Sequence, residues 1–173
     1  KKEGFNPKRS IVFLHVTAEE RGLLGSEYYT DFDPLVPIES TITNLNIDMI
    51  GRLDDWHNTG DYVYLIGSNR LSYDLHNINE EINSNYTKLE LDYKYNDEDD
   101  PNRYYYRSDH YNFAKNNIPV IFYFNGVHED YHRPSDTIEK LDFNKIKKIS
   151  KLVFLTAWEL ANREERIKLR DDL

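Results

Sequence analysis

Cysteine is absent from this chain of 173 residues, so disulfide bonds and thiolate metal ligands are both excluded. Any metal ion must be held by histidine, aspartate or glutamate, a set that suits zinc and harder divalent cations. No apolar run is long enough to span a lipid bilayer. Basic residues are also in deficit: 22 Lys and Arg face 31 Asp and Glu, for a net charge of −9. This deficit argues against nucleic acid or an anionic membrane as a partner.

Segments rich in β-branched and aromatic residues alternate with segments of helical periodicity, and the length suits one domain. The expected strands are 11–16, 41–48, 62–66, 89–95 and 118–124, and the expected helices are 23–29, 71–82, 108–116 and 143–160. The run IPVIFYF at 118–124 is the most hydrophobic and is expected at the centre. This alternation predicts an α/β fold, a three-layer sandwich with a mixed, mainly parallel central sheet flanked by helices.

Two adjacent carboxylates, Glu19 and Glu20, directly follow the first expected strand. Ligand sites of open α/β sheets lie just beyond the carboxyl ends of strands, so chemistry is expected there. One glutamate can bind a metal while its neighbour acts as a base. The alternative interpretation is a solvated pair that opens a helix, where acids complement the helix dipole.

Two further candidate side chains follow expected strands. Asp48 ends the strand 41–48, and His132 lies in the loop that follows 118–124. The carboxyl ends of parallel strands meet at one edge of a sheet, so these groups are expected near Glu19 and Glu20. Together they match a zinc site without thiolates, with one carboxylate to spare.

Residues 128–132 read His-Glu-Asp-Tyr-His, which has the H-E-x-x-H spacing of a zinc-binding helix. That mechanism requires a helix, in which both histidines share one face. Gly126 and Pro134 bracket the motif, and the proline biases Arg133 away from helical geometry. We therefore expect a loop that presents His132 alone as a ligand.

Four segments, in order, resemble the M28 family of zinc aminopeptidases: TAEERGLLGS, NIDMIGR, YRSDHYNF and GVHEDYHRPSD. The resemblance implies a peptide substrate and a metallo-aminopeptidase activity with zinc as the cofactor, and it suggests an extracellular or periplasmic location. The resemblance implies that Glu19 is the general base and that Tyr131 supports the oxyanion. It implies that Glu20 and His132 bind one metal ion and that Asp48 binds the other. Arg107 and Asp109 match supporting or substrate-facing residues of the family.

The sequence departs from that family upstream of the Glu-Glu motif. The family binds two zinc ions with a histidine and a bridging aspartate from an upstream segment, whereas only KKEGFNPKRSIVFLHVTA precedes Glu19 here. His15 lies inside the expected strand, where a core role is expected. We therefore expect residues 1–173 to be a single peptidase domain that lacks its N-terminal part. Such a chain is expected to hold at most one zinc ion weakly and to be inactive alone.

Two other functions remain open from the sequence. One is a single-zinc acyltransferase similar to glutaminyl cyclase, and the other is a non-catalytic binding module with a peptidase-like fold. Nothing in the sequence specifies an oligomeric state.

Overall fold

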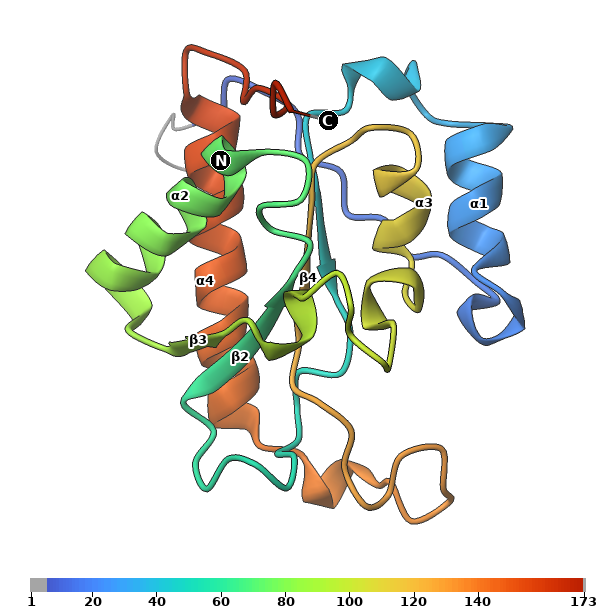
Figure 1. Ribbon diagram of the computed structural model, residues 1–173, viewed down its shortest axis with the longest axis vertical. Coiled ribbons are helices and arrows are strands. Elements are labelled where there is room, and N and C mark those ends of the chain that lie inside the picture. The colour runs from blue at the N-terminus through green and yellow to red at the C-terminus, as the bar shows by residue number, and fades with distance from the viewer. Residues whose placement is uncertain (1–5, 173) are drawn as a thin grey trace.

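Two strands of continuous apolar residues form the centre of a four-stranded sheet in the computed structural model, which describes residues 6–172 (Figure 1). These strands are β2 (Tyr62–Ile66) and β4 (Val120–Phe124), and every residue in them is buried. β1 (Asn44–Ile47) lies at one edge and β3 (Glu90–Asp92) at the other, in the order β1-β4-β2-β3. The outer pairs are parallel and the central pair is antiparallel, which confirms the mixed, mainly parallel sheet.

Helices cover both faces of this sheet (Figure 1). On one face, α2 (Tyr73–Ile82) and α4 (Phe143–Asn162) bury an aliphatic cluster that includes Leu75, Ile149 and Leu152. On the other face, α3 (His110–Ala114) packs through Phe113 onto aromatic side chains of β2 and β4, with α1 (Leu24–Asp31) beside it. The predicted three-layer α/β architecture is therefore confirmed.

The segment 11–16 is not the buried strand that the sequence predicted. It forms no strand and its side chains are largely exposed, Phe13 at 86% and Val12 at 50%. His15 is exposed as well and is not a core residue. Apolar, β-branched composition makes a strand only where a neighbouring strand supplies hydrogen bonds. Among the described residues, β1 pairs with β4 alone, and no strand pairs with 11–16.

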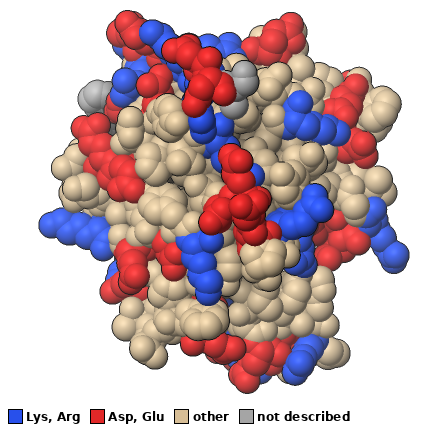
Figure 2. Space-filling view, viewed as in Figure 1, with Lys and Arg blue, Asp and Glu red and all other residues tan. Residues whose placement is uncertain are grey.

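The described residues contain no candidate membrane-spanning helix, and the face drawn in Figure 2 carries charges of both signs. None of their helices combines the length and the apolar character that crossing a bilayer requires. On the face drawn in Figure 2, acidic and basic side chains are interspersed, without a broad basic patch.

Candidate active site

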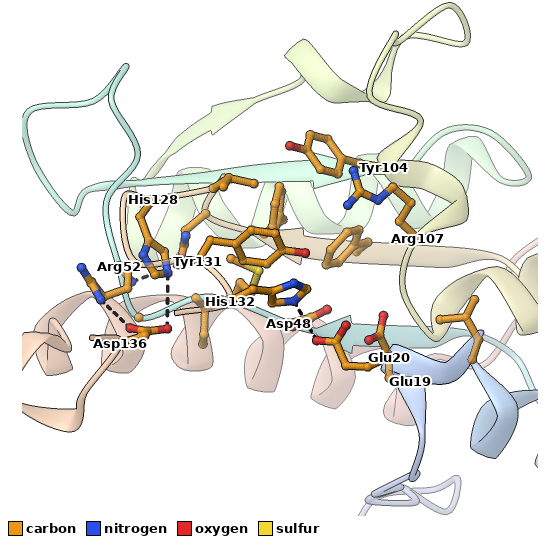
Figure 3. A pocket seen from close by; sticks show the side chains of 18 of the residues that line it. Glu19, Glu20, Asp48, Arg52, Tyr104, Arg107, His128, Tyr131, His132 and Asp136 are labelled. Carbon is orange, nitrogen blue, oxygen red and sulfur yellow. Dashed lines mark hydrogen bonds and ion pairs between the residues drawn. The ribbon is translucent and has the colours of Figure 1, made fainter. Parts of the chain in front are cut away.

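A cavity of about 640 Å³ opens beyond the carboxyl ends of β1 and β4. Because these two strands are parallel and adjacent, the loops that follow them meet at this end of the sheet. The chain segments before α1 and before α3 complete the wall (Figure 3). The predicted site residues that line the cavity are Glu19, Glu20, Asp48, Arg107, Tyr131 and His132.

Glu19 and Glu20 lie in a short 3₁₀ turn, Glu19–Arg21, that precedes α1. The turn is flanked by Ala18 and Gly22, both in the left-handed backbone region, so the chain reverses sharply here. Gly25 is required next to the turn, because a Cβ atom at this position would lie 2.3 Å from the Thr17 carbonyl oxygen. This geometry places both glutamates on the cavity wall rather than on the outer face of a helix.

Asp48 directly follows β1, and its carboxylate accepts a hydrogen bond from Ser108 Oγ at 2.9 Å. No side chain caps α3, although Ser108 lies just before this helix. The Ser108 hydroxyl instead fixes the direction of the Asp48 side chain. Its partner lies 60 residues away in the chain, so local sequence could not reveal this contact.

Tyr131 and His132 lie in a turn that follows β4, and residues 127–132 form no helix. The predicted loop is therefore confirmed, and the two histidines of the H-E-x-x-H match do not share a helical face. His132 has a left-handed backbone with φ of 56°. Its Nε2 atom lies 2.9 Å from Glu20 Oε1, and its ring stacks on Tyr131 at 3.8 Å. Figure 3 shows His132 and Glu20 in contact, with Asp48 and Glu19 beside them.

The acidic side of the cavity carries uncompensated negative charge. Burial, together with the charges of Asp48, Glu20 and Asp109, raises the pKa of Glu19 to about 7. Burial also raises the pKa of Asp48 and of Asp109. Among the described residues, no lysine or arginine pairs with any of these carboxylates, and His132 pairs only with Glu20. Such a cluster is electrostatically suited to a divalent cation.

The donor set fits zinc in its chemistry, because Glu20 and His132 already lie in contact and Asp48 is close to Glu20. One carboxylate oxygen of Asp109 is buried without a hydrogen-bond partner, which also marks a place prepared for positive charge. Within the described residues, however, Glu20, Asp48 and His132 do not bring three ligand atoms within 4.8 Å of one another.

The far side of the cavity holds a second group of ionisable residues, which the sequence analysis did not identify. Ligand atoms of His128, Asp130 and Asp136 lie within 4.8 Å of one another. Arg52 contacts both aspartates, Asp130 at 2.6 Å and Asp136 at 2.5 Å. Lys140 also binds Asp130, at 2.7 Å. The negative charge of this group is thus already balanced by two cations.

Arg107 and Asp109 differ in position although they are close in sequence. The Arg107 guanidinium lies 5.1 Å from the centre of the Tyr104 ring, on the wall opposite the acidic residues (Figure 3). Among the described residues it forms no ion pair. Burial and the charges of Glu20, Glu19 and Asp48 raise the pKa of Tyr131. The charge of Arg107 lowers it, so charges on both walls of the cavity act on this phenol. Asp109 is not among the lining residues, but it lies close enough to Glu19 and Asp48 for its charge to raise the pKa of both.

Comparisons with known proteins identify a family model that matches the chain and solved structures of similar fold. The model of peptidase family M28 matches residues 1–157. The LapA aminopeptidase of Legionella pneumophila is 26% identical, with a TM-score of 0.72, over 94% of this chain and 42% of that one. BSAP, a zinc aminopeptidase from Bacillus subtilis, is 21% identical with a TM-score of 0.67, over 91% and 38%. LapB from Legionella pneumophila is 21% identical with a TM-score of 0.75, over 94% and 42%.

The chain therefore spans about two fifths of the length of these solved structures. A comparison with curated proteins finds no match.

Proposed function

Because the chain belongs to peptidase family M28, we propose that it carries the catalytic residues of a zinc-dependent aminopeptidase that releases N-terminal residues from peptides. The observation that carries this proposal is the meeting of Glu19, Glu20, Asp48, Tyr131 and His132 in one cavity. The solved aminopeptidases of similar fold support it.

Glu19 is the proposed general base. It lines the cavity, contacts no cation in the described structure, and has a pKa raised to about 7. A carboxylate with such a pKa can accept a proton from the attacking water and deliver it to the departing amine near neutral pH. Zinc, when bound by Glu20 and His132, supplies Lewis acidity that lowers the pKa of water and polarises the scissile carbonyl.

Tyr131 is the proposed oxyanion donor. A tyrosine phenol is protonated at neutral pH, and the pKa of Tyr131 is raised further by burial, so the hydroxyl can donate a hydrogen bond as negative charge develops on the carbonyl oxygen. The neighbouring carboxylates favour a cationic substrate group beside them, which suits the free ammonium of a peptide N-terminus. Arg107, on the opposite wall, places a positive charge near Tyr131, where it favours the same developing negative charge.

Asp109 supports the site without lining the cavity, as its position close to Glu19 and Asp48 suggests. We further propose that the 173-residue chain alone holds at most one zinc ion, weakly, and has no appreciable activity. Glu20 and His132 are two ligands, whereas catalytic zinc sites typically have three protein ligands and water.

Hydrolysis of aminoacyl nitroanilides by the zinc-loaded full-length protein tests the proposed function. An aminopeptidase releases nitroaniline from a substrate with a free α-amine and not from its N-acetylated counterpart. Cyclisation of peptides with N-terminal glutamine, without hydrolysis of the anilides, would instead support the glutaminyl-cyclase-like alternative. Zinc binding with neither reaction would support the binding module.

A further inference from the structure

Arg52 joins two of the three segments that carry the proposed metal ligands, the loop with Asp48 and the loop with His132. It follows β1 by five residues and Asp48 by four, and its backbone N–H donates to Asn125 Oδ1 at 3.0 Å. Its guanidinium binds Asp130 Oδ2 at 2.6 Å and Asp136 Oδ1 at 2.5 Å. We name Arg52, Asp130 and Asp136 the arginine clasp.

The two aspartates of the clasp flank Tyr131 and His132 in sequence. The clasp therefore ties both ends of the turn that presents these residues to the loop that presents Asp48. The Arg52 side chain is 12% exposed and that of Asp130 is 6% exposed, so the contact is shielded from water. A planar guanidinium that binds two carboxylates also fixes direction, which a single ion pair does not.

The turn needs such a tie, because it has no regular structure of its own. Its internal backbone hydrogen bonds, Tyr131 N to His128 O and Arg133 N to Asp130 O, each join residues only three apart. His132 has a left-handed φ of 56°, a backbone conformation that is strained for a residue other than glycine. Since 53% of the His132 side chain is exposed, packing holds its ring only partly in place.

The same cluster has the residue types of a metal site, with His128, Asp130 and Asp136 close together. Arg52 and Lys140 already bind its carboxylates and repel a further cation. Burial and the charge of Arg52 lower the pKa of His128, which is consistent with a neutral ring beside a cation already in place. The charge balance thus favours a structural contact over a third metal position.

Building on the proposed function, we propose that Arg52 is a positioning residue: through Asp130 and Asp136 it sets the direction of His132 and Tyr131 toward Glu20 and Asp48. Groups that orient metal ligands from behind typically change metal affinity by roughly tenfold to a hundredfold when removed. Arg52 is expected to act on that scale.

The test compares Arg52→Met, Arg52→Lys and Lys140→Met. In the full-length protein, zinc affinity is measured by calorimetry, kcat and KM by anilide hydrolysis, and exchange of the backbone amides of residues 129–133, 135 and 136 by hydrogen–deuterium exchange. Arg52→Met is expected to weaken zinc binding roughly tenfold or more, lower kcat more than it raises KM, and speed exchange in this turn. Arg52→Lys should recover part of each loss. Lys140→Met leaves the clasp intact and should stay within about twofold of wild type in zinc affinity.

A lower melting temperature in Arg52→Met with unchanged zinc affinity and unchanged exchange in the turn would overturn the proposal. If Arg52→Met does not fold, Asp136→Asn removes one arm of the clasp at a position that is 39% exposed, and the same shifts are expected at smaller size. Exchange in the turn does not depend on peptidase activity. Faster exchange in Arg52→Met therefore supports the clasp even if the wild type proves not to be a peptidase. Zinc lost from His128→Ala but retained by His132→Ala would show a metal site in place of the clasp.

Discussion

The two sides of the cavity contain the same kind of group in opposite electrostatic states. On one side, Glu19, Asp48 and Asp109 have no lysine or arginine partner among the described residues, and the pKa of each is raised. On the other side, hydrogen bonds from Lys140, Ser135 and Arg52 lower the pKa of Asp130. We propose that the carboxylates neutralised by Arg52 and Lys140 hold the loops in place. We propose that those without a counter-charge bind a cation from solution.

The largest effect should come from the proposed base. In the full-length protein, Glu19→Gln is expected to lower kcat by about a hundredfold or more and to leave zinc content intact, because the amide cannot accept the proton. Glu129→Gln is the matched control, an exposed glutamate that would be the base in the H-E-x-x-H interpretation. Loss of rate in Glu129→Gln with a normal rate in Glu19→Gln would reverse the two assignments.

Lys145 is a buried basic residue without a counter-charge in contact among the described residues, so it can be compared with the acids that lack one. Its side chain is 1% exposed, and its Nζ has no hydrogen-bond partner and lies 3.1 Å from the centre of the Tyr62 ring. Burial lowers its pKa from 10.5 to about 7, although Asp54, Asp142 and Asp61 oppose the shift. Between these two values the unfolded chain holds more protons than the folded one, so this residue makes stability rise with pH.

Lys145→Met should therefore raise the free energy of unfolding at pH 7 by about 4 kcal/mol, the linkage energy of a pKa that falls from 10.5 to about 7, and flatten its increase between pH 7 and 10. Urea unfolding at several pH values measures both. Lys147→Met, at an exposed position of the same helix, should change neither. An unchanged pH profile in Lys145→Met would show that Lys145 is charged in the folded state.

Arg107 lines the cavity and, among the described residues, forms no ion pair with a carboxylate. Arg107→Met is expected to lower kcat/KM by about tenfold, because the positive charge beside Tyr131 that favours a developing oxyanion is lost. Arg103→Met is the matched control: Arg103 also lies over a tyrosine ring, that of Tyr106, but outside the cavity wall. Equal losses in the two variants would assign the effect to surface charge in general.

Most of the fold was predictable because its signals are local. The buried strand Tyr62–Ile66 and the long helix from Phe143 are encoded by continuous apolar residues and by a helical stripe. Gly126 and Pro134 sufficed to exclude the H-E-x-x-H helix. The prediction of a strand at 11–16 was wrong, because apolar composition cannot specify whether a partner strand lies beside the segment.

The site was predictable only in part, for a related reason. Strand ends mark where Asp48 and His132 lie, whereas Glu19 follows the segment 11–16, which forms no strand. The contacts that orient them depend on tertiary structure: Ser108 is 60 residues from Asp48, and Arg52 is 78 residues from Asp130. No periodicity or short motif encodes pairs so far apart in the chain.

The central claim is that the uncompensated acids, with His132, bind zinc, whereas the group around Arg52 does not. Calorimetric titration of zinc into the 173-residue chain and its His132→Ala and His128→Ala variants tests this claim most directly. We predict at most one weakly held ion in the wild type, retained by His128→Ala and lost from His132→Ala. Equal loss in both variants, or two tightly bound ions in the wild type, would contradict the claim.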